Sequence, residues 1–131
     1  MTNSTLTLFR QDTFEPAEPQ AERLVLANDA DPRDSSLEGI TVVELQFPKF
    51  SDGRAFSQAF LLRRRLGFKG SIRAIGDVLV DQLPQMARTG FSEAVLRADQ
   101  DLSVGARQIE RYASHYQGDA VRATPRFVEL A

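Results

Sequence analysis

Short apolar runs alternate with helical stripes along this chain, and this alternation constrains the fold more than any other feature. Ile40–Phe47 (ITVVELQF), Ile72–Ile75 and Ala94–Arg97 each have the length and apolar content of a buried strand. After each of them, apolar residues recur every three or four positions, as on one face of an α-helix. The order strand–helix–strand–helix–strand–helix predicts βαβ crossovers and a parallel sheet.

The ends of the helices can also be predicted. Ser51–Gly53 offers side-chain oxygens that can cap a helix start, and Gly67 favours a helix end. The stripe of this helix comprises Ala55, Ala59, Leu62 and Leu66, widened by Phe56 and Phe60. Pro84 has no backbone N–H, so we expect a break near Leu83 with Pro84 in the first turn of the next helix. The last helix is expected over Leu102–Tyr116.

We therefore expect one α/β domain with a small parallel or mixed sheet of three to four strands. The 131 residues are enough for one core. We expect residues 1–22 to be a flexible N-terminal arm with a short strand at Leu6–Arg10, residues 23–118 to form the domain, and residues 119–131 to be a tail that is irregular or an edge strand. The open edges of so small a sheet favour a homo-oligomer.

The composition argues against several kinds of site. The chain has no cysteine, a single histidine and no G-x-G-x-x-G motif, so we expect no metal, no disulfide and no bound cofactor. The net charge of −2 argues against nucleic-acid and membrane partners. The N-terminus lacks the pattern of a signal peptide and no apolar run has the length of a membrane span, so we expect a cytoplasmic protein.

Positive charge is concentrated around the first helix. The basic residues there are Lys49, Arg54, Arg63, Arg64, Arg65, Lys69 and Arg73. Ligands of parallel α/β folds bind beyond the carboxyl ends of strands, which is where Lys49–Arg54 follows Ile40–Phe47. A glycine-containing turn at a helix start with two cations suits an oxyanion such as phosphate, sulfate or sulfite. The alternative is a well-capped helix with solvated cations, and Arg63–Arg65 can likewise be a solvated face.

Two aspartates follow the basic stretch. Asp77 and Asp81 are one helical turn apart and could form an acid–base pair or bind magnesium. An aspartate at a helix start more often serves as a cap, which is the interpretation we favour for Asp77. The charge of Arg54 is unfavourable at a helix start, so we expect it to bind an anion or a carboxylate, with Asp77 as the internal candidate.

The segment from Phe47 to Leu83, with RTGF after it, resembles the signature of a bacterial family known as domain of unknown function 934. The matching positions are Phe47–Phe50, Asp52–Arg54, Ser57, Leu61–Arg63, Arg65, Gly67–Phe68, Arg73–Ala74, Gly76–Leu79, Asp81–Leu83 and Arg88–Phe91. Tyr116-Gln117 resembles a later element of the family. The chain departs from the family pattern at Thr89, where a cysteine is frequent, and at Pro84, where other members continue a helix.

The resemblance implies a role in sulfur metabolism, because members are described as oxidoreductases or as accessory proteins of assimilatory sulfite reduction. Thr89 argues against a thiol-dependent role, and the sequence contains no redox motif. We expect an accessory protein that binds a small oxyanion or a partner, either sulfite reductase or another enzyme of sulfur assimilation. The expected binding residues are Lys49, Asp52, Gly53, Arg54, Arg63, Arg65, Arg73 and Gln82.

The sequence is compatible with two other functions. The chain could be an enzyme for a phosphorylated or sulfated substrate, with Asp77 or Asp81 as the acid–base. It could also be a structural adaptor whose arginines dock an acidic partner.

Overall fold

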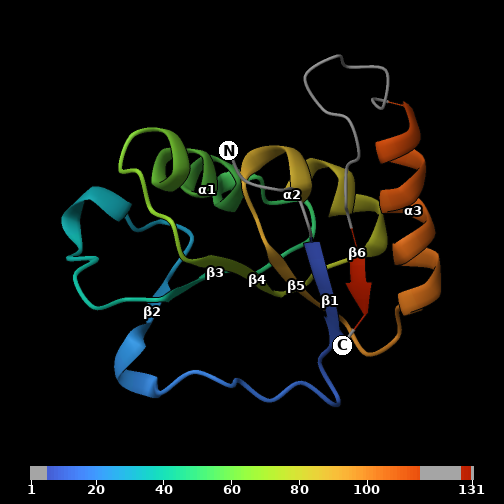
Figure 1. The fold of residues 1–131 in the computed structure, drawn as a ribbon, viewed down its shortest axis with the longest axis horizontal. Coiled ribbons are helices and arrows are strands. Elements are labelled where there is room, and N and C mark those ends of the chain that lie inside the picture. The colour runs from blue at the N-terminus through green and yellow to red at the C-terminus, as the bar shows by residue number, and fades with distance from the viewer. Residues whose placement is uncertain (1–5, 116–127, 131) are drawn as a thin grey trace.

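The computed structural model of the chain describes residues 6–115 and 128–130. Within these ranges, six strands form one sheet in the order β2-β3-β4-β5-β1-β6, and all neighbouring strands run parallel (Figure 1). The strands are β1 (Leu6–Arg10), β2 (Arg23–Leu26), β3 (Val42–Phe47), β4 (Ser71–Gly76), β5 (Glu93–Leu96) and β6 (Val128–Leu130). The predicted α/β class and parallel sheet are confirmed, with more strands than expected.

The helices lie on one side of this sheet. They are α1 (Arg54–Arg64), α2 (Leu83–Thr89) and α3 (Leu102–His115), with short 3-10 turns at Gln20–Glu22, Pro32–Asp34 and Val80–Gln82. Figure 1 shows α1 and α2 over the sheet and α3 at the end near β1 and β6. No helix within 6–115 or 128–130 is long and apolar enough to cross a bilayer.

The core lies between the helices and the sheet face beneath them. The strands contribute Val43, Leu45, Phe47, Ile72, Ala74, Ala94, Leu96, Leu6 and Leu8, and the helices contribute Ala55, Ala59, Leu62, Leu83, Met86 and Ile109. Each fully buried large apolar side chain stabilises the fold by about 1.5–3 kcal/mol. The alternation of side chains along each strand sends these residues to the helix side and their neighbours to the opposite face.

The helix boundaries agree with most of the sequence signals. α2 begins at Leu83, has Pro84 in its first turn and ends before Gly90, whose φ is 113°. The prediction of a break at this proline is confirmed. α1 ends at Arg64, so the expectation that Leu66 continues its buried stripe was wrong, and Leu66 is 37% exposed.

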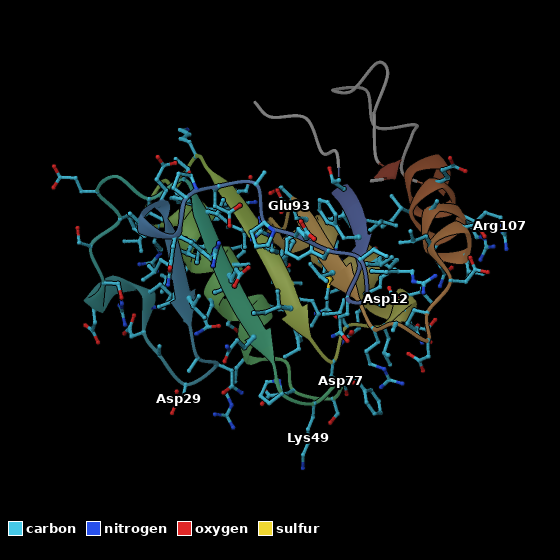
Figure 2. All side chains as sticks on the ribbon, turned by 90° about the horizontal axis from the view of Figure 1, so that it is seen from below. Asp12, Asp29, Lys49, Asp77, Glu93 and Arg107 are labelled. Carbon is cyan, nitrogen blue, oxygen red and sulfur yellow. The ribbon has the colours of Figure 1, made fainter. Side chains whose placement is uncertain are left out.

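Residues 6–22, which the sequence assigns to a flexible arm, are part of the folded structure. β1 lies between β5 and β6, where it buries Leu6 and Leu8 completely. β1 is near one edge of the sheet and β2 forms the other, so residues 11–22 must cross from one side to the other. They cross the face that the helices leave open (Figure 2). The expected tail contributes β6, and residues 116–127, including Tyr116-Gln117, lie outside the described residues.

Candidate functional site

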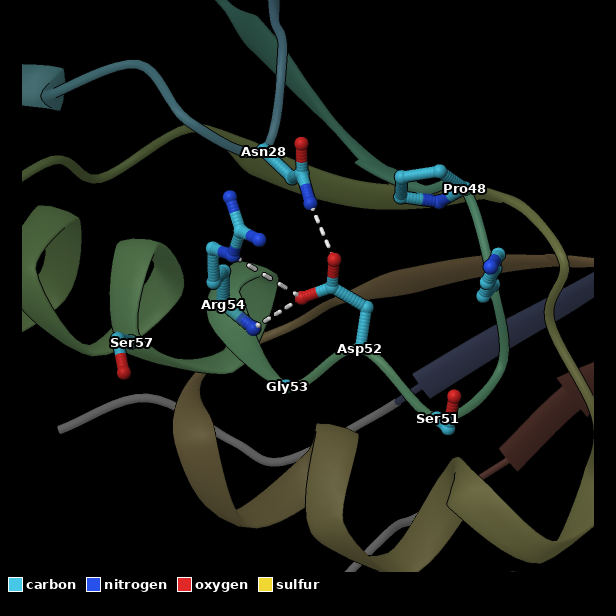
Figure 3. A pocket seen from close by; sticks show the side chains of 8 residues that line it. Asn28, Pro48, Ser51, Asp52, Gly53, Arg54 and Ser57 are labelled. Carbon is cyan, nitrogen blue, oxygen red and sulfur yellow. Dashed lines mark hydrogen bonds and ion pairs between the residues drawn. The ribbon is translucent and has the colours of Figure 1, made fainter.

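The loop between β3 and α1, residues 48–53, lies at the carboxyl edge of the sheet. An open pocket lies between this loop, the start of α1 and the segment after β2 (Figure 3). Its lining consists of Asn28, Pro48, Lys49, Ser51, Asp52, Gly53, Arg54 and Ser57. Four of the expected site residues, Lys49, Asp52, Gly53 and Arg54, therefore meet here.

Asp52 caps α1 and occupies the centre of this pocket. Its Oδ1 accepts a hydrogen bond from the Arg54 N–H at 3.0 Å, and its Oδ2 accepts one from the Asn28 side-chain amide. The Arg54 Nε lies 3.6 Å from Oδ1, with the Arg54 side chain 64% exposed. The N-cap residue itself is Gly53, which has no side chain to bond, so the side-chain oxygen expected from Ser51–Gly53 is supplied by Asp52, one residue earlier. The carboxylate also offsets the positive charge of Arg54 at the helix start.

Asp77 holds the same loop from the side of β4. Its Oδ2 accepts a hydrogen bond from the Phe50 N–H at 2.7 Å, and its Oδ1 accepts one from Arg97 Nη1 at 2.7 Å. Arg97 is the main cause of the lowered pKa of Asp77, and the Phe50 N–H adds to it. The predictions that Asp77 caps a helix and pairs with Arg54 were wrong, because its two oxygens are directed to Arg97 and to the loop.

Gln82 completes the support of Phe50. Its Nε2 donates to the Phe50 carbonyl at 2.8 Å, while its Oε1 accepts from the Leu79 N–H at 2.8 Å. Both backbone polar groups of Phe50 are thus bound by side chains that follow β4. Phe50 as a whole is 56% exposed. The arrangement fixes the backbone and leaves the aromatic side chain in solvent.

Gly76 allows β4 to approach β3 closely enough for these contacts. Its φ is 103°, and a Cβ at this position would lie 2.5 Å from the Phe47 carbonyl oxygen. The Asp77 N–H donates to that same oxygen at 2.7 Å. Gln11 Nε2 donates to the Gly76 carbonyl at 2.7 Å. Only glycine combines this conformation with this approach, so Gly76 places Asp77 beside the loop.

Arg73 lies away from the pocket, on the sheet face opposite the helices. Only 3% of its side chain is exposed, and it donates to Glu44 at 2.7 Å, to Glu18 at 2.8 Å and to Glu93 at 2.7 Å. The Phe14 ring centroid is 4.7 Å from its guanidinium carbon. These contacts clamp residues 11–22 to the sheet.

The charges of this cluster stabilise each other. Burial works to lower the pKa of Arg73, but the hydrogen bonds that it donates to its three glutamate partners outweigh burial and raise it. The hydrogen bond from Arg73 is the main cause that lowers the pKa of Glu18 to about 2, and Arg23 adds to this effect. Every donor group of Arg73 is directed to a carboxylate of the chain itself.

Arg63 and Arg65 are also remote from the pocket, since they lie at or just after the end of α1. Arg63 Nε donates to the Gly90 carbonyl at 2.9 Å, and its Nη1 donates to the carbonyls of Phe68 and Gly70 at 2.9 and 2.7 Å. Burial lowers the pKa of Arg63. Arg65 is exposed. The eight expected binding residues therefore divide into the pocket group, the supporting Gln82 and three remote arginines.

The arrangement of the two aspartates offers little for acid–base chemistry. Asp77 has a lowered pKa and is engaged on both oxygens, so it is a poor proton donor and a weak base. Asp81 lies in the exposed 3-10 turn after β4, 3.4 Å from Gln108 Nε2. Among the residues that the structure describes, no group of three or more His, Cys, Asp or Glu side chains is placed to hold a metal ion.

Sequence reasoning missed the roles of Arg97 and Asn28. Arg97 follows β5 and binds Asp99 through Nη2 at 2.7 Å as well as Asp77, and it lowers the pKa of Asp99 to about 2. A charged residue at the carboxyl end of a strand was the available signal. Nothing local to Asn28 indicates that it contacts Asp52.

The fold and the site together define a small parallel α/β domain that presents a braced loop at the carboxyl edge of its sheet. The family model described as "Bacterial protein of unknown function (DUF934)" matches residues 23–127, and the chain belongs to this family. The resemblance seen in the signature residues is thus confirmed. A comparison with curated proteins gives no match.

Proposed function

We propose that this chain is a cytoplasmic accessory protein of assimilatory sulfite reduction that docks on a partner enzyme through the loop Pro48–Gly53. Sulfite reductase, or another enzyme of sulfur assimilation, is the proposed partner. The observation that supports docking is the geometry of Phe50. Its backbone N–H and carbonyl are bound by Asp77 and Gln82, while the residue as a whole is 56% exposed.

A braced loop with an exposed aromatic ring suits protein recognition for a physical reason. Binding normally orders loops and side chains at an entropic cost, and a loop that is already fixed avoids most of that cost. Aromatic and arginine side chains are enriched in the centres of protein interfaces. Phe50 is next to Lys49 and near Arg54, both exposed, so the loop combines apolar and positive groups.

The same geometry makes a catalytic role less suitable. Asp77 is bound to Arg97 and to the Phe50 N–H, and Asp81 accepts one hydrogen bond among the described residues, from Gln108. The side chain of His115 lies outside the described residues. The alternative of an enzyme that acts on a phosphorylated or sulfated substrate rests on Asp77 or Asp81 as the acid–base.

A second candidate function, oxyanion binding, is favoured by the lining of the pocket. Lys49, Arg54, Ser51 and Ser57 offer donors at the start of α1, and Arg54 is held to Asp52 only across 3.6 Å. The Asp52 carboxylate weighs against this function, because it already caps the helix and adds negative charge to the pocket. An oxyanion would have to bind beside this carboxylate.

Two measurements test these functions. Co-elution of the purified chain with sulfite reductase from the same organism would support docking. Melting temperatures in chloride, sulfite, sulfate, phosphate and adenylyl sulfate at matched ionic strength test the oxyanion, because a ligand at a hundred times its Kd adds about 2.7 kcal/mol. Absence of co-elution contradicts docking, and equal melting temperatures contradict oxyanion binding.

We also propose that the protein self-associates. β2 is an edge strand of the sheet in the described residues, and its Val25 is 47% exposed. An edge strand has free backbone groups that can pair with a second copy. Light scattering during gel filtration measures the mass, and a monomer at all concentrations contradicts this proposal.

A further inference from the structure

The second half of α1 carries exposed apolar side chains of its own. Phe60 is 48% exposed and Leu66, just beyond the helix, is 37% exposed. Among the described residues, the only other exposed large apolar side chains are Val25 and Phe50. α1 has 11 residues and is therefore about 16 Å long, so its end is well separated from the loop Pro48–Gly53.

Three basic residues are close in the chain to these two side chains. Arg64, Arg65 and Lys69 are exposed, and none of the three has a salt bridge or a side-chain hydrogen bond to another described residue. The guanidinium carbon of Arg64 lies 5.1 Å from the centroid of the Phe60 ring. We call Phe60, Arg64, Arg65, Leu66 and Lys69 the α1 basic patch.

The support for this patch is rigid. Arg63 binds three backbone carbonyls, those of Phe68 and Gly70 in the loop that carries Lys69, and that of Gly90 after α2. The Leu66 N–H is bound to the Leu61 carbonyl at 3.0 Å. A surface fixed in this way loses little conformational freedom when it binds.

We propose that the α1 basic patch is a second docking surface, and that its partner is an acidic protein segment that inserts an apolar side chain beside Phe60 and Leu66. Three exposed cations, none with a salt bridge to another described residue, and two exposed apolar side chains beside them in the chain are complementary to such a segment in both charge and polarity. This surface is separate from the loop Pro48–Gly53 and does not depend on the function proposed for that loop.

An anionic membrane suits the patch less well. Stable binding to a bilayer requires an apolar helix face that enters the lipid or a larger cluster of basic residues. α1 turns its main apolar face inward, where Ala55, Ala59 and Leu62 are completely buried. Only Phe60 and Leu66 are exposed here. Two apolar side chains are enough to contact an apolar side chain of a protein partner, but they are a small surface for insertion into lipid.

The test uses the full chain and a short synthetic helical peptide of Glu and Leu, with a peptide of Lys and Leu as its control. Binding is measured by fluorescence anisotropy of the labelled peptide. The variant Arg64→Glu with Arg65→Glu reverses the charge of the patch, and Phe60→Ser removes its ring. The matched control is Arg107→Glu with Arg111→Glu, which makes the same charge change on the exposed side of α3.

We expect the acidic peptide to bind and the basic peptide not to bind. Charge reversal on α1 should weaken binding at least about tenfold, since two charge-assisted contacts are lost. Phe60→Ser should also weaken it, while the α3 control should change it less than about twofold. Binding should weaken with added salt, since the cations are exposed.

Three results would overturn the proposal. One is no binding of the acidic peptide, and another is equal weakening by the α1 and α3 charge reversals. The third is binding to phosphatidylglycerol vesicles, but not to the peptide, that is lost on charge reversal of α1, which would assign the patch to a membrane surface. Circular dichroism of each variant shows whether the fold is retained, and Phe60→Ser provides a second test that leaves the charge unchanged.

Discussion

Asp77 accepts a hydrogen bond from the backbone N–H of Phe50 at 2.7 Å, although the two residues are 27 positions apart in the chain. This bond joins the loop after β3 to the loop after β4. Together with the bond from Gln82 to the Phe50 carbonyl, it turns an exposed connection into a fixed surface. The proposed docking through Phe50 depends on these two hydrogen bonds.

Asp77→Ala should release the loop. The substitution removes the acceptor of the Phe50 N–H and the partner of Arg97, so we expect a loss of stability. The amide of Phe50 should exchange with solvent faster, which nuclear magnetic resonance measures directly. Asp31→Ala is the control, because Asp31 also accepts a hydrogen bond from a backbone N–H and pairs with an arginine, Arg33. Unchanged exchange in Asp77→Ala would show that the loop does not need this bond.

Arg73→Met should be strongly destabilising. The substitution leaves Glu18, Glu44 and Glu93 next to each other without their shared cation, and breaking a buried ion pair costs about 3–5 kcal/mol. Urea denaturation monitored by circular dichroism measures the effect. Arg64→Met is the control, since Arg64 is exposed and should cost less than about 1 kcal/mol. Similar midpoints for both variants would contradict a structural role of Arg73.

Acid should weaken the clamp on residues 11–22. The pKa of Glu18 falls from 4.5 to about 2 in the folded state, chiefly through its hydrogen bond with Arg73. Because the pKa of Glu18 is lower in the folded state than in the unfolded state, ionised Glu18 stabilises the fold. This contribution is complete above about pH 4.5 and is lost as the pH falls towards 2. Denaturation measured across this window should therefore show falling stability, with a smaller slope in Glu18→Gln. Equal slopes in both proteins would contradict this assignment.

Arg54→Ala should affect binding more than folding. Arg54 is 64% exposed and 3.6 Å from Asp52, so its loss should change stability by less than about 1 kcal/mol. If the pocket or loop binds its ligand or partner through Arg54, the substitution should weaken binding by about 1–3 kcal/mol. Calorimetric titration and thermal melts of the same sample separate the two effects. Unfolding without a change in affinity would assign Arg54 to the fold.

The sequence was sufficient for the features that depend on local pattern. The apolar run of β3, the buried stripe of Ala55, Ala59 and Leu62, and the proline at the start of α2 each define an element through residues close in the chain. The cap at Asp52 is local in the same sense. Such features are set by spacing and backbone chemistry.

The other features of the structure depend on which strands pair and in what register, which the sequence alone does not show. Nothing in the sequence around Arg73 indicates that Glu44 and Glu93 face it, because this follows from the pairing of β3 with β4 and of β4 with β5. The approach of Glu18 depends on the path of residues 11–22 across the sheet. β1 was similarly hard to place, since its partners β5 and β6 lie far away in the chain. The candidate site was therefore only partly predictable.

The most direct test of the proposed docking is the affinity of sulfite reductase for Phe50→Ala, measured by calorimetric titration beside the unchanged protein and Val25→Ala. Val25 is 47% exposed and lies on β2, outside the loop Pro48–Gly53. Loss of an aromatic side chain at the centre of an interface typically costs at least about 2 kcal/mol, which is more than tenfold in Kd. We expect such a loss for Phe50→Ala and an unchanged Kd for Val25→Ala. An unchanged Kd for Phe50→Ala in a folded protein would contradict the proposed docking.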